Sequence, residues 1–227
     1  MKTTVIIPAL NEEETLPKVL ADMPHGIINE VIVVDNGSSD RTALIAKDWG
    51  ATVLFESRRG YGYPCLRAIE YLKTAPPDVV VFVDGNYSDH PSEIPKLLRP
   101  IEKDGYDMVL GSRVMGECEK GALRPPVLFG NWLATTLMRL FYGFRYTDLG
   151  PFRAVRFDKL LALDVKDNLG WTLEMQIKAV KKRYKILEVP VSYRKGEGKS
   201  KLTGNIKGIF KVGFKILWNI FKYLFTN

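Results

Sequence analysis

Val81-Phe-Val-Asp84-Gly-Asn-Tyr-Ser-Asp89-His-Pro91 is the stretch of this sequence that decides the fold. An apolar run with β-strand character delivers the carboxylate of Asp84 onto a polar turn, and a second carboxylate, Asp89, follows five residues later. Mg²⁺ and Mn²⁺ prefer hard oxygen ligands and keep open positions for phosphate oxygens of a substrate. The stretch therefore predicts a strand end that holds a metal ion against a diphosphate, although a strand ending in a plain polar turn has the same pattern.

The composition is that of one folded domain. The 227 residues are 46% hydrophobic and 26% charged, which is typical of a globular protein and excludes disorder. Cys65 and Cys118 lie far apart without a Cys-x-x-Cys or Cys/His cluster, so we expect no disulfide framework or structural zinc site, and a reducing compartment. We expect no signal peptide, because the strand-like run Val5–Pro8 follows Met1 almost at once.

The net charge of +7 belongs to one end of the chain. From Arg194 onward, eight basic residues accompany one acidic residue, Glu197, so residues 1–193 carry no net charge. A basic tail on a neutral body indicates a polyanionic surface met at one end, rather than a nucleic acid bound across the domain.

Apolar runs alternate with longer periodic segments in the first half of the chain. The pattern predicts strands over residues 4–8, 31–35, 52–55, 79–84 and 108–111, and helices over residues 13–23, 40–49, 62–73 and 92–103. Such alternation predicts right-handed βαβ crossovers, and hence an α/β fold with a mostly parallel sheet covered by helices on both faces. Ligands of such sheets bind at the carboxyl ends of the strands.

The glycines of this half do not indicate a nicotinamide cofactor. Gly60-x-Gly62 lacks the third glycine of a dinucleotide-binding fingerprint and does not lie in the first βα turn. That first turn, Pro8–Glu12, contains no glycine. A dinucleotide-dependent dehydrogenase is therefore not expected.

Several motifs together resemble the inverting glycosyltransferase family 2: Ile7–Glu13, Val33–Asp40, Asp84–Asn86, Gly111–Arg113 and Thr147–Arg153. Two more, Gly170–Glu174 and Glu188–Arg194 followed by Gly198–Lys201, resemble the polyprenyl-phosphate sugar synthases of that family, such as dolichyl-phosphate mannose or glucose synthases. The resemblance runs from Thr4 to about Leu202. It implies a Rossmann-like nucleotide-diphospho-sugar transferase fold (GT-A) for a catalytic domain of residues 1–203.

The resemblance also implies the donor site. Its nucleotide pocket would comprise Pro8, Ala9, Asn11, Glu12 and Asp35. A carboxylate at a strand end accepts hydrogen bonds from base N–H groups or ribose hydroxyls, although Asp35 alternatively caps the turn that leads into Asp40. Asp84 would bind the cofactor, Mg²⁺ or Mn²⁺. Asn86 stands where the family's Asp-x-Asp motif has a second carboxylate, so the second ligand is either the Asn86 amide oxygen or Asp89, while His90 is expected to orient the turn.

Basic residues would neutralise the diphosphate leaving group and the acceptor phosphate. Arginine suits this task because its guanidinium binds phosphate oxygens in pairs. The resemblance implies phosphate contacts from Arg113, Arg153, Arg194 and Lys201, with Arg124 as a weaker candidate. Alternatively, Arg153 pairs with Asp148 and holds the loop between them.

Glu174 stands, by the same resemblance, where related sugar transferases keep a general base for a hydroxyl acceptor. It lies one turn after Trp171 on an expected helix. A polyprenyl phosphate is already ionised near neutral pH and needs little deprotonation. We therefore expect Glu174 to position metal or acceptor, while alignment and leaving-group stabilisation, with Asp84 and Arg113, supply the catalysis.

Residues 204–227 predict a C-terminal basic amphipathic helix. Lys207, Lys211 and Lys215 lie four residues apart among large apolar residues, and the longest uncharged stretch, Ile216–Phe221, is far short of the roughly 20 residues that span a bilayer. This pattern predicts a membrane-interface helix, or alternatively a core helix on the sheet. The uncharged stretch Pro125–Met138 is expected either to hold the lipid acceptor, as in the related synthases, or to form a buried helix.

The sequence thus predicts a peripheral enzyme on the cytoplasmic face of a membrane. It would transfer one sugar, with inversion, from a nucleoside diphosphate sugar to a dolichyl or undecaprenyl phosphate. One alternative is a transferase acting on a glycan hydroxyl, with Glu174 as base. Another is a membrane-bound nucleotide-sugar-binding protein without turnover, because Asn86 weakens the metal motif. The sequence does not indicate the oligomeric state.

Overall fold

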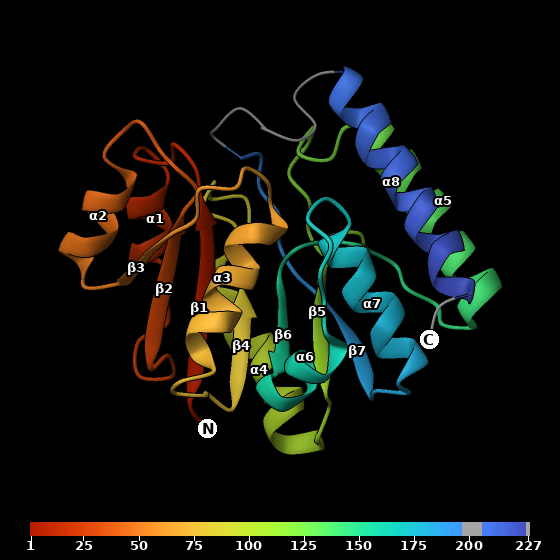
Figure 1. Cartoon of the computed structure of the whole chain (residues 1–227), viewed down its shortest axis with the longest axis horizontal. Coiled ribbons are helices and arrows are strands. Elements are labelled where there is room, and N and C mark those ends of the chain that lie inside the picture. Colours follow the sequence, from red (N-terminus) through yellow and green to blue (C-terminus); the bar gives the residue numbers. More distant parts are fainter. Residues whose placement is uncertain (197–205, 226–227) are drawn as a thin grey trace.

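One mixed sheet forms the centre of the molecule. The computed structural model of the chain describes residues 1–196 and 206–225 (Figure 1). In this part of the chain seven strands pair in the order β3-β2-β1-β4-β6-β5-β7. Their bounds are β1 (Thr3–Ala9), β2 (Glu30–Asp35), β3 (Thr52–Phe55), β4 (Val79–Phe82), β5 (Met108–Ser112), β6 (Arg153–Arg156) and β7 (Ile186–Pro190). β6 runs antiparallel to both of its neighbours, β4 and β5, and the other pairs are parallel, so the predicted mostly parallel sheet is confirmed.

Helices cover both faces of the sheet, also as predicted (Figure 1). One face packs against α1 (Leu16–Ala21), α2 (Thr42–Trp49) and α4 (Ile94–Asp104), which follows the 3₁₀ turn Pro91–Glu93. The other side holds α3 (Gly62–Leu72), α5 (Pro125–Tyr142), α6 (Phe157–Leu163), α7 (Trp171–Lys181) and α8 (Ile206–Phe225). Val5 and Ile7 of β1 enter the first core and Ile6 enters the second, because successive side chains of a strand point to opposite faces.

The strands and helices predicted as far as β5 are confirmed, with shifted ends. The helix predicted from residue 13 begins only at Leu16, because the preceding residues form a turn in which the Thr15 hydroxyl donates to the Glu12 carboxylate at 2.8 Å. β6 and β7 were not predicted. Each is short and carries a charged residue, Arg153 or Glu188, that breaks the apolar pattern of a strand.

The two apolar segments of the C-terminal half form neighbouring helices, α5 and α8, which lie side by side (Figure 1). The inner side of α8 is buried through Asn219, Ile220 and Tyr223, and the Tyr142 hydroxyl donates to the Ile220 carbonyl at 2.5 Å. The segment predicted as a separate terminal unit, residues 204–227, therefore includes a helix packed onto the body of the protein. Within the described residues, no helix has the length and apolar character to cross a membrane.

Candidate active site

The predicted donor-site residues gather at one edge of the sheet. β1 lies between β2 and β4, and the three strands are parallel, so their carboxyl ends meet. Ala9 pairs in register with Asp35, and Asp84 follows β4 directly after Val83. Residues from three distant parts of the sequence are thereby brought to one place, as predicted for a ligand site of a parallel sheet.

The turns after β1 and β2 are held together by reciprocal hydrogen bonds. The Asn11 side-chain oxygen accepts from the Ser39 amide at 2.8 Å, and the Ser38 hydroxyl accepts from the Asn11 amide at 2.9 Å. One carboxylate oxygen of Asp35 accepts from the Ser38 amide at 3.0 Å, which is the turn-capping role considered for this residue. A cavity of about 230 Å³ adjoins these turns, and its lining includes Asn11, Glu12 and Asp40. Capping leaves the second Asp35 oxygen as a candidate acceptor for a nucleotide.

Asp84 and Asp89 form a close pair of carboxylates. The Asp84 amide donates to Asp89 Oδ2 at 3.0 Å, and the Tyr61 hydroxyl donates to Asp84 Oδ1 at 2.7 Å. Asp89 is buried, and its Oδ1 has no hydrogen-bond partner among the described residues. Burial, followed by the neighbouring Asp84 charge, raises the pKa of Asp89 to about 7, and burial also raises the pKa of Asp84. Two adjacent carboxylates in such surroundings favour a compensating cation.

These residues fit a divalent metal ion. Hard oxygen donors and an orphaned buried carboxylate oxygen are what Mg²⁺ or Mn²⁺ would satisfy. In residues 1–196 and 206–225, no group of three or more His, Cys, Asp or Glu residues is arranged to hold a metal, so substrate oxygens would complete the coordination. Asn86 is committed elsewhere, because its side-chain oxygen accepts from the Ser88 amide at 3.0 Å and hydroxyl at 2.6 Å. Of the two predicted second ligands, the geometry favours Asp89.

Arg113 is held rigidly beside this pair. It follows β5, and its Nε and Nη2 donate to the two oxygens of Asp148 at 2.7 Å each. Asp148 is fixed in turn, because Glu188 accepts its amide at 3.1 Å. Asp148 raises the pKa of Arg113 even though burial alone would lower it. The guanidinium is therefore a permanently charged, preorganised group, and its field lowers the pKa of Asp84 and Asp89 against the effect of burial.

Arg153 occupies a different place from the one predicted. It is 0% exposed, donates to the carbonyls of Gly150 and Thr172, and does not form the predicted alternative pair with Asp148, which Arg113 takes. Burial lowers its pKa to about 10, which keeps it charged at neutral pH. A phosphate contact from Arg153 does not agree with this enclosed position; the side chain instead ties the loop before β6 to α7.

The remaining basic candidates are spread out. Arg194 stacks on the Tyr87 ring at 3.6 Å and lies 2.9 Å from His90 Nδ1, so it packs on the loop that carries Asp89. The His90 ring thus contacts Arg194, and this contact is compatible with the expected role of His90 in orienting the turn. Arg124 is exposed at the start of α5, away from any ion pair that the structure describes, and Lys201 lies outside the described residues.

Glu174 is buried and surrounded by donors. Its Oε2 accepts from the amides of Lys166 and Asp167 at 3.0 and 2.6 Å. Its Oε1 accepts from the Tyr223 hydroxyl and the Lys178 ammonium, each at 2.7 Å. With four donors, this carboxylate joins the segment that precedes α7 to helix α8. It leaves no open side for an acceptor hydroxyl.

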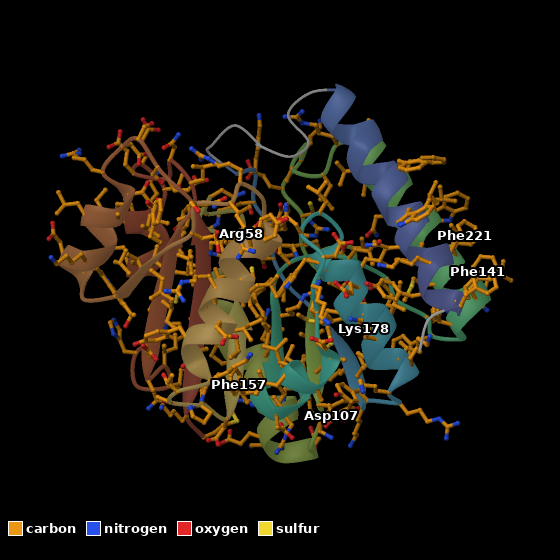
Figure 2. All side chains as sticks on the ribbon, viewed as in Figure 1. Arg58, Asp107, Phe141, Phe157, Lys178 and Phe221 are labelled. Carbon is orange, nitrogen blue, oxygen red and sulfur yellow. The ribbon has the colours of Figure 1, made fainter. Side chains whose placement is uncertain are left out.

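The outer side of α5 and α8 is an exposed apolar surface, called here the α5–α8 face. It comprises Leu128, Phe129, Trp132, Leu140 and Phe141 from α5, and Phe214, Trp218, Phe221 and Phe225 from α8. The rings of Phe141 and Phe221 are in contact across the two helices, with their centroids 5.5 Å apart. Figure 2 shows both side chains projecting from the outer side of the pair. Exposed Arg139 and Lys222 lie on the same two helices. Contiguous exposed apolar surface on a folded domain is typical of binding surfaces.

Comparison with solved structures identifies the fold. Glucosyl-3-phosphoglycerate synthase from Mycobacterium tuberculosis, in complex with Mn²⁺, uridine diphosphate and phosphoglyceric acid, superposes with a TM-score of 0.80. It is 21% identical, and the match covers 100% of this chain and 79% of that chain. The fold is therefore that of the GT-A nucleotide-sugar transferases, as predicted.

Sequence comparison gives the family. The model of glycosyl transferase family 2 matches residues 4–162, so the chain belongs to this family and is a glycosyltransferase. It is 38% identical over 210 residues to an uncharacterised glycosyltransferase of Mycobacterium tuberculosis, covering 90% of this chain and 91% of that protein. It is 35% identical over 204 residues to the dolichyl-phosphate hexose transferase of Haloferax volcanii, covering 87% of this chain and 85% of that protein. The predicted resemblance is confirmed.

Sequence reasoning missed Tyr61, Asn168 and Asn219. Tyr61 donates to Asp84, Asn168 contacts the backbone around Tyr61, and Asn219 is a fully buried amide on α8. The tyrosine between two glycines and the lone asparagine among aromatic residues were the available signals. Neither points to a partner without the fold.

Proposed function

We propose that this glycosyltransferase moves a sugar, with inversion, from a nucleoside diphosphate sugar to a polyprenyl phosphate at the cytoplasmic face of a membrane. The observation that carries the proposal is the α5–α8 face, where nine large apolar side chains are exposed on two adjacent helices. Aromatic residues beside basic ones favour the boundary between lipid tails and anionic headgroups. A lipid-borne acceptor explains why a site for a water-soluble sugar donor is combined with such a surface in one domain.

The donor end of the reaction rests on Asp84, Asp89 and Arg113. The two carboxylates would hold Mg²⁺ or Mn²⁺, which when bound neutralises charge on the diphosphate leaving group. Arg113, kept charged by Asp148, adds a second fixed positive group near the same place. Because both are held before substrate arrives, little reorganisation is needed when charge develops on the leaving diphosphate. The nucleotide itself would lie on the turns that contain Asn11 and Asp35.

The acceptor end needs positioning more than proton transfer. A phosphate monoester carries its nucleophilic oxygen already ionised, so a general base adds little. The four donors on Glu174 support this view, since they occupy both oxygens of that carboxylate. A structural role for Glu174 replaces the predicted positioning of metal or acceptor.

Transfer of label tests the proposal. The protein is incubated with Mn²⁺, a polyprenyl phosphate and each of a set of labelled sugar nucleotides, and label is followed into the organic phase. We expect one donor to give an organic-soluble, mild-acid-labile product. Label that enters only aqueous glycans would identify a hydroxyl acceptor instead, and the absence of turnover with any donor or acceptor would indicate a binding protein.

A further inference from the structure

The segment between α6 and α7 joins two parts of the molecule that are far apart in the sequence. On one side it contacts the loop before α3: the Gly62 amide donates to Asn168 Oδ1 at 2.9 Å and to the Asn168 carbonyl at 3.1 Å. The Asn168 side-chain amide in turn points to the Arg59 carbonyl at 3.4 Å. Asn168 therefore binds the backbone on both sides of Tyr61.

This contact explains the Gly60-x-Gly62 pair. Gly60 has a φ of 146°, and a Cβ there would lie 2.0 Å from the Asn168 side-chain nitrogen. A Cβ at Gly62 would lie 2.5 Å from the Asp167 carbonyl oxygen. Both distances are too short for any side chain, so the two glycines let residues 167 and 168 pack directly on this loop.

On its other side the same segment is bound to α8. The Asn219 side-chain amide donates to Asp167 Oδ2 at 2.8 Å, and Asn219 is 0% exposed. The Asp167 amide donates to Glu174, whose other oxygen accepts from the Tyr223 hydroxyl. The inner side of the helix that carries the α5–α8 face is thus hydrogen-bonded to the residue that precedes Asn168.

Tyr61 completes the connection to the donor site. It lies between the two glycines, and its hydroxyl donates to Asp84 Oδ1 at 2.7 Å. The Tyr61 ring also packs near Trp171, the first residue of α7, with ring centroids 6.2 Å apart. The backbone on both sides of Tyr61 is therefore held by the segment that α8 holds, and the Tyr61 ring packs near the helix that follows this segment.

We propose that Tyr61, Asn168 and Asn219 are positioning residues through which α8 orients the carboxylate of Asp84 toward the metal ion. The position of α8 on the body of the protein then determines the orientation of the Asp84 carboxylate. Binding of any partner to the outer side of α8 is thereby coupled to metal binding at Asp84. The proposal rests on the proposed function in one respect, namely that Asp84 is a metal ligand. It makes α8 part of the donor machinery and not only an anchor.

The experiment compares Asn219→Ala with a matched control, Tyr142→Phe. Each variant removes one hydrogen bond of α8, and the two bonds involve the neighbouring residues Asn219 and Ile220. The Asn219 bond connects α8 to Asp167, whereas the bond from the Tyr142 hydroxyl to the Ile220 carbonyl connects α8 to α5. Hydrogen–deuterium exchange is measured on the metal-free protein over residues 58–64, and Mn²⁺ affinity is measured by titration with a nucleoside diphosphate present. We expect Asn219→Ala to speed exchange in this peptide and to weaken Mn²⁺ binding by about threefold to tenfold, with Tyr142→Phe near the parent in both.

Further variants locate the route. Tyr61→Phe keeps the ring and should weaken Mn²⁺ binding without changing exchange in α8. Asn168→Ala should speed exchange over residues 58–64 and weaken Mn²⁺ binding, and it tests the proposal even if Asn219→Ala does not fold. Parental Mn²⁺ affinity in Tyr61→Phe and Asn168→Ala, or equal losses in Asn219→Ala and Tyr142→Phe, would overturn the proposal. Neither readout needs an acceptor or a membrane, so failure here is distinct from failure of the lipid-phosphate assignment.

Discussion

The donor edge of the sheet and the α5–α8 pair are built in opposite ways. At the donor edge, polar groups such as Asn11, Asp35 and Asp84 stand at strand ends above an apolar core, each tied by short hydrogen bonds. In α8, the side chains of Asn219 and Tyr223 are buried, whereas the phenylalanine and tryptophan side chains of the outer side are exposed. The first arrangement fixes charges for a polar ligand, whereas the second presents apolar surface outward. Under the proposed function, this contrast corresponds to two substrates that come from different phases, a water-soluble donor and a lipid-borne acceptor.

The largest effect is expected at the donor edge from Asp84→Ala. Transfer should fall by about 10³-fold or more, because the carboxylate proposed to hold the metal ion against the diphosphate is lost while the fold is retained. Initial rates at saturating Mn²⁺, with circular dichroism as a check of folding, measure this. Asp48→Ala, which removes an exposed carboxylate on α2, is the control and should be neutral. Activity of Asp84→Ala within a factor of two of the parent would refute the metal assignment.

Arg113→Lys should give the next largest loss, on the order of tenfold to a hundredfold in transfer rate. Lysine keeps the charge but cannot reproduce the two-point bond to Asp148, so the positive group is no longer fixed. Steady-state rates with the sugar nucleotide varied measure the effect. Arg156→Lys, at an exposed pair with Asp158, serves as the matched change. If the two variants behave alike, preorganisation of Arg113 is not what the reaction uses.

The α5–α8 face is tested by the double variant Trp218→Ser/Phe221→Ser. Each exposed aromatic side chain that inserts into lipid is worth roughly 1.5–3 kcal/mol, so affinity for anionic vesicles should fall by at least about a hundredfold. Sedimentation with vesicles measures it, and nucleotide binding should be unchanged. Trp49→Ser/Phe55→Ser removes two exposed aromatic residues elsewhere and should pellet like the parent. Equal pelleting of both doubles would mean that this face does not meet the membrane.

Glu174→Gln should have the smallest effect on the chemical step. An amide cannot accept from four donors as a carboxylate does, so we expect a stability loss of about 1–3 kcal/mol and only a few-fold decrease in rate. Thermal denaturation and the pH dependence of the rate are measured together. Loss of a pH-dependent limb, with a decrease near the top of the ~10²–10⁴-fold range of a general base, would instead favour a hydroxyl acceptor.

Most of the donor edge could be predicted from the sequence. Parallel strands read as apolar runs, and a polar residue directly after such a run must lie at the carboxyl edge, so Asp35 and Asp84 were placed without coordinates. Motif spacing does not show what a side chain touches once folded. Arg153 therefore looked like a phosphate ligand and is a buried support, while its expected partner Asp148 belongs to Arg113.

The C-terminal half was less predictable for the same reason. Residues 204–227 have the composition of an interfacial helix, and the described part of α8 does expose aromatic side chains. The pattern could not show that Asn219 binds Asp167 and that Tyr223 binds Glu174, because those partners lie about 50 residues away. Deleting the helix would therefore expose buried core and strip Glu174 of a donor, which is why point substitutions test the membrane assignment better than truncation.

One measurement tests most directly whether the enzyme transfers sugar from a water-soluble donor to a lipid-borne acceptor. The rate of sugar transfer is compared for a long polyprenyl phosphate in anionic vesicles and for a short, water-soluble prenyl phosphate at the same concentration. The account predicts that the parent strongly favours the long acceptor and that Trp218→Ser/Phe221→Ser loses this preference while it keeps its rate on the short acceptor. Equal rates on both acceptors in the parent, or an undiminished preference in the variant, would contradict it.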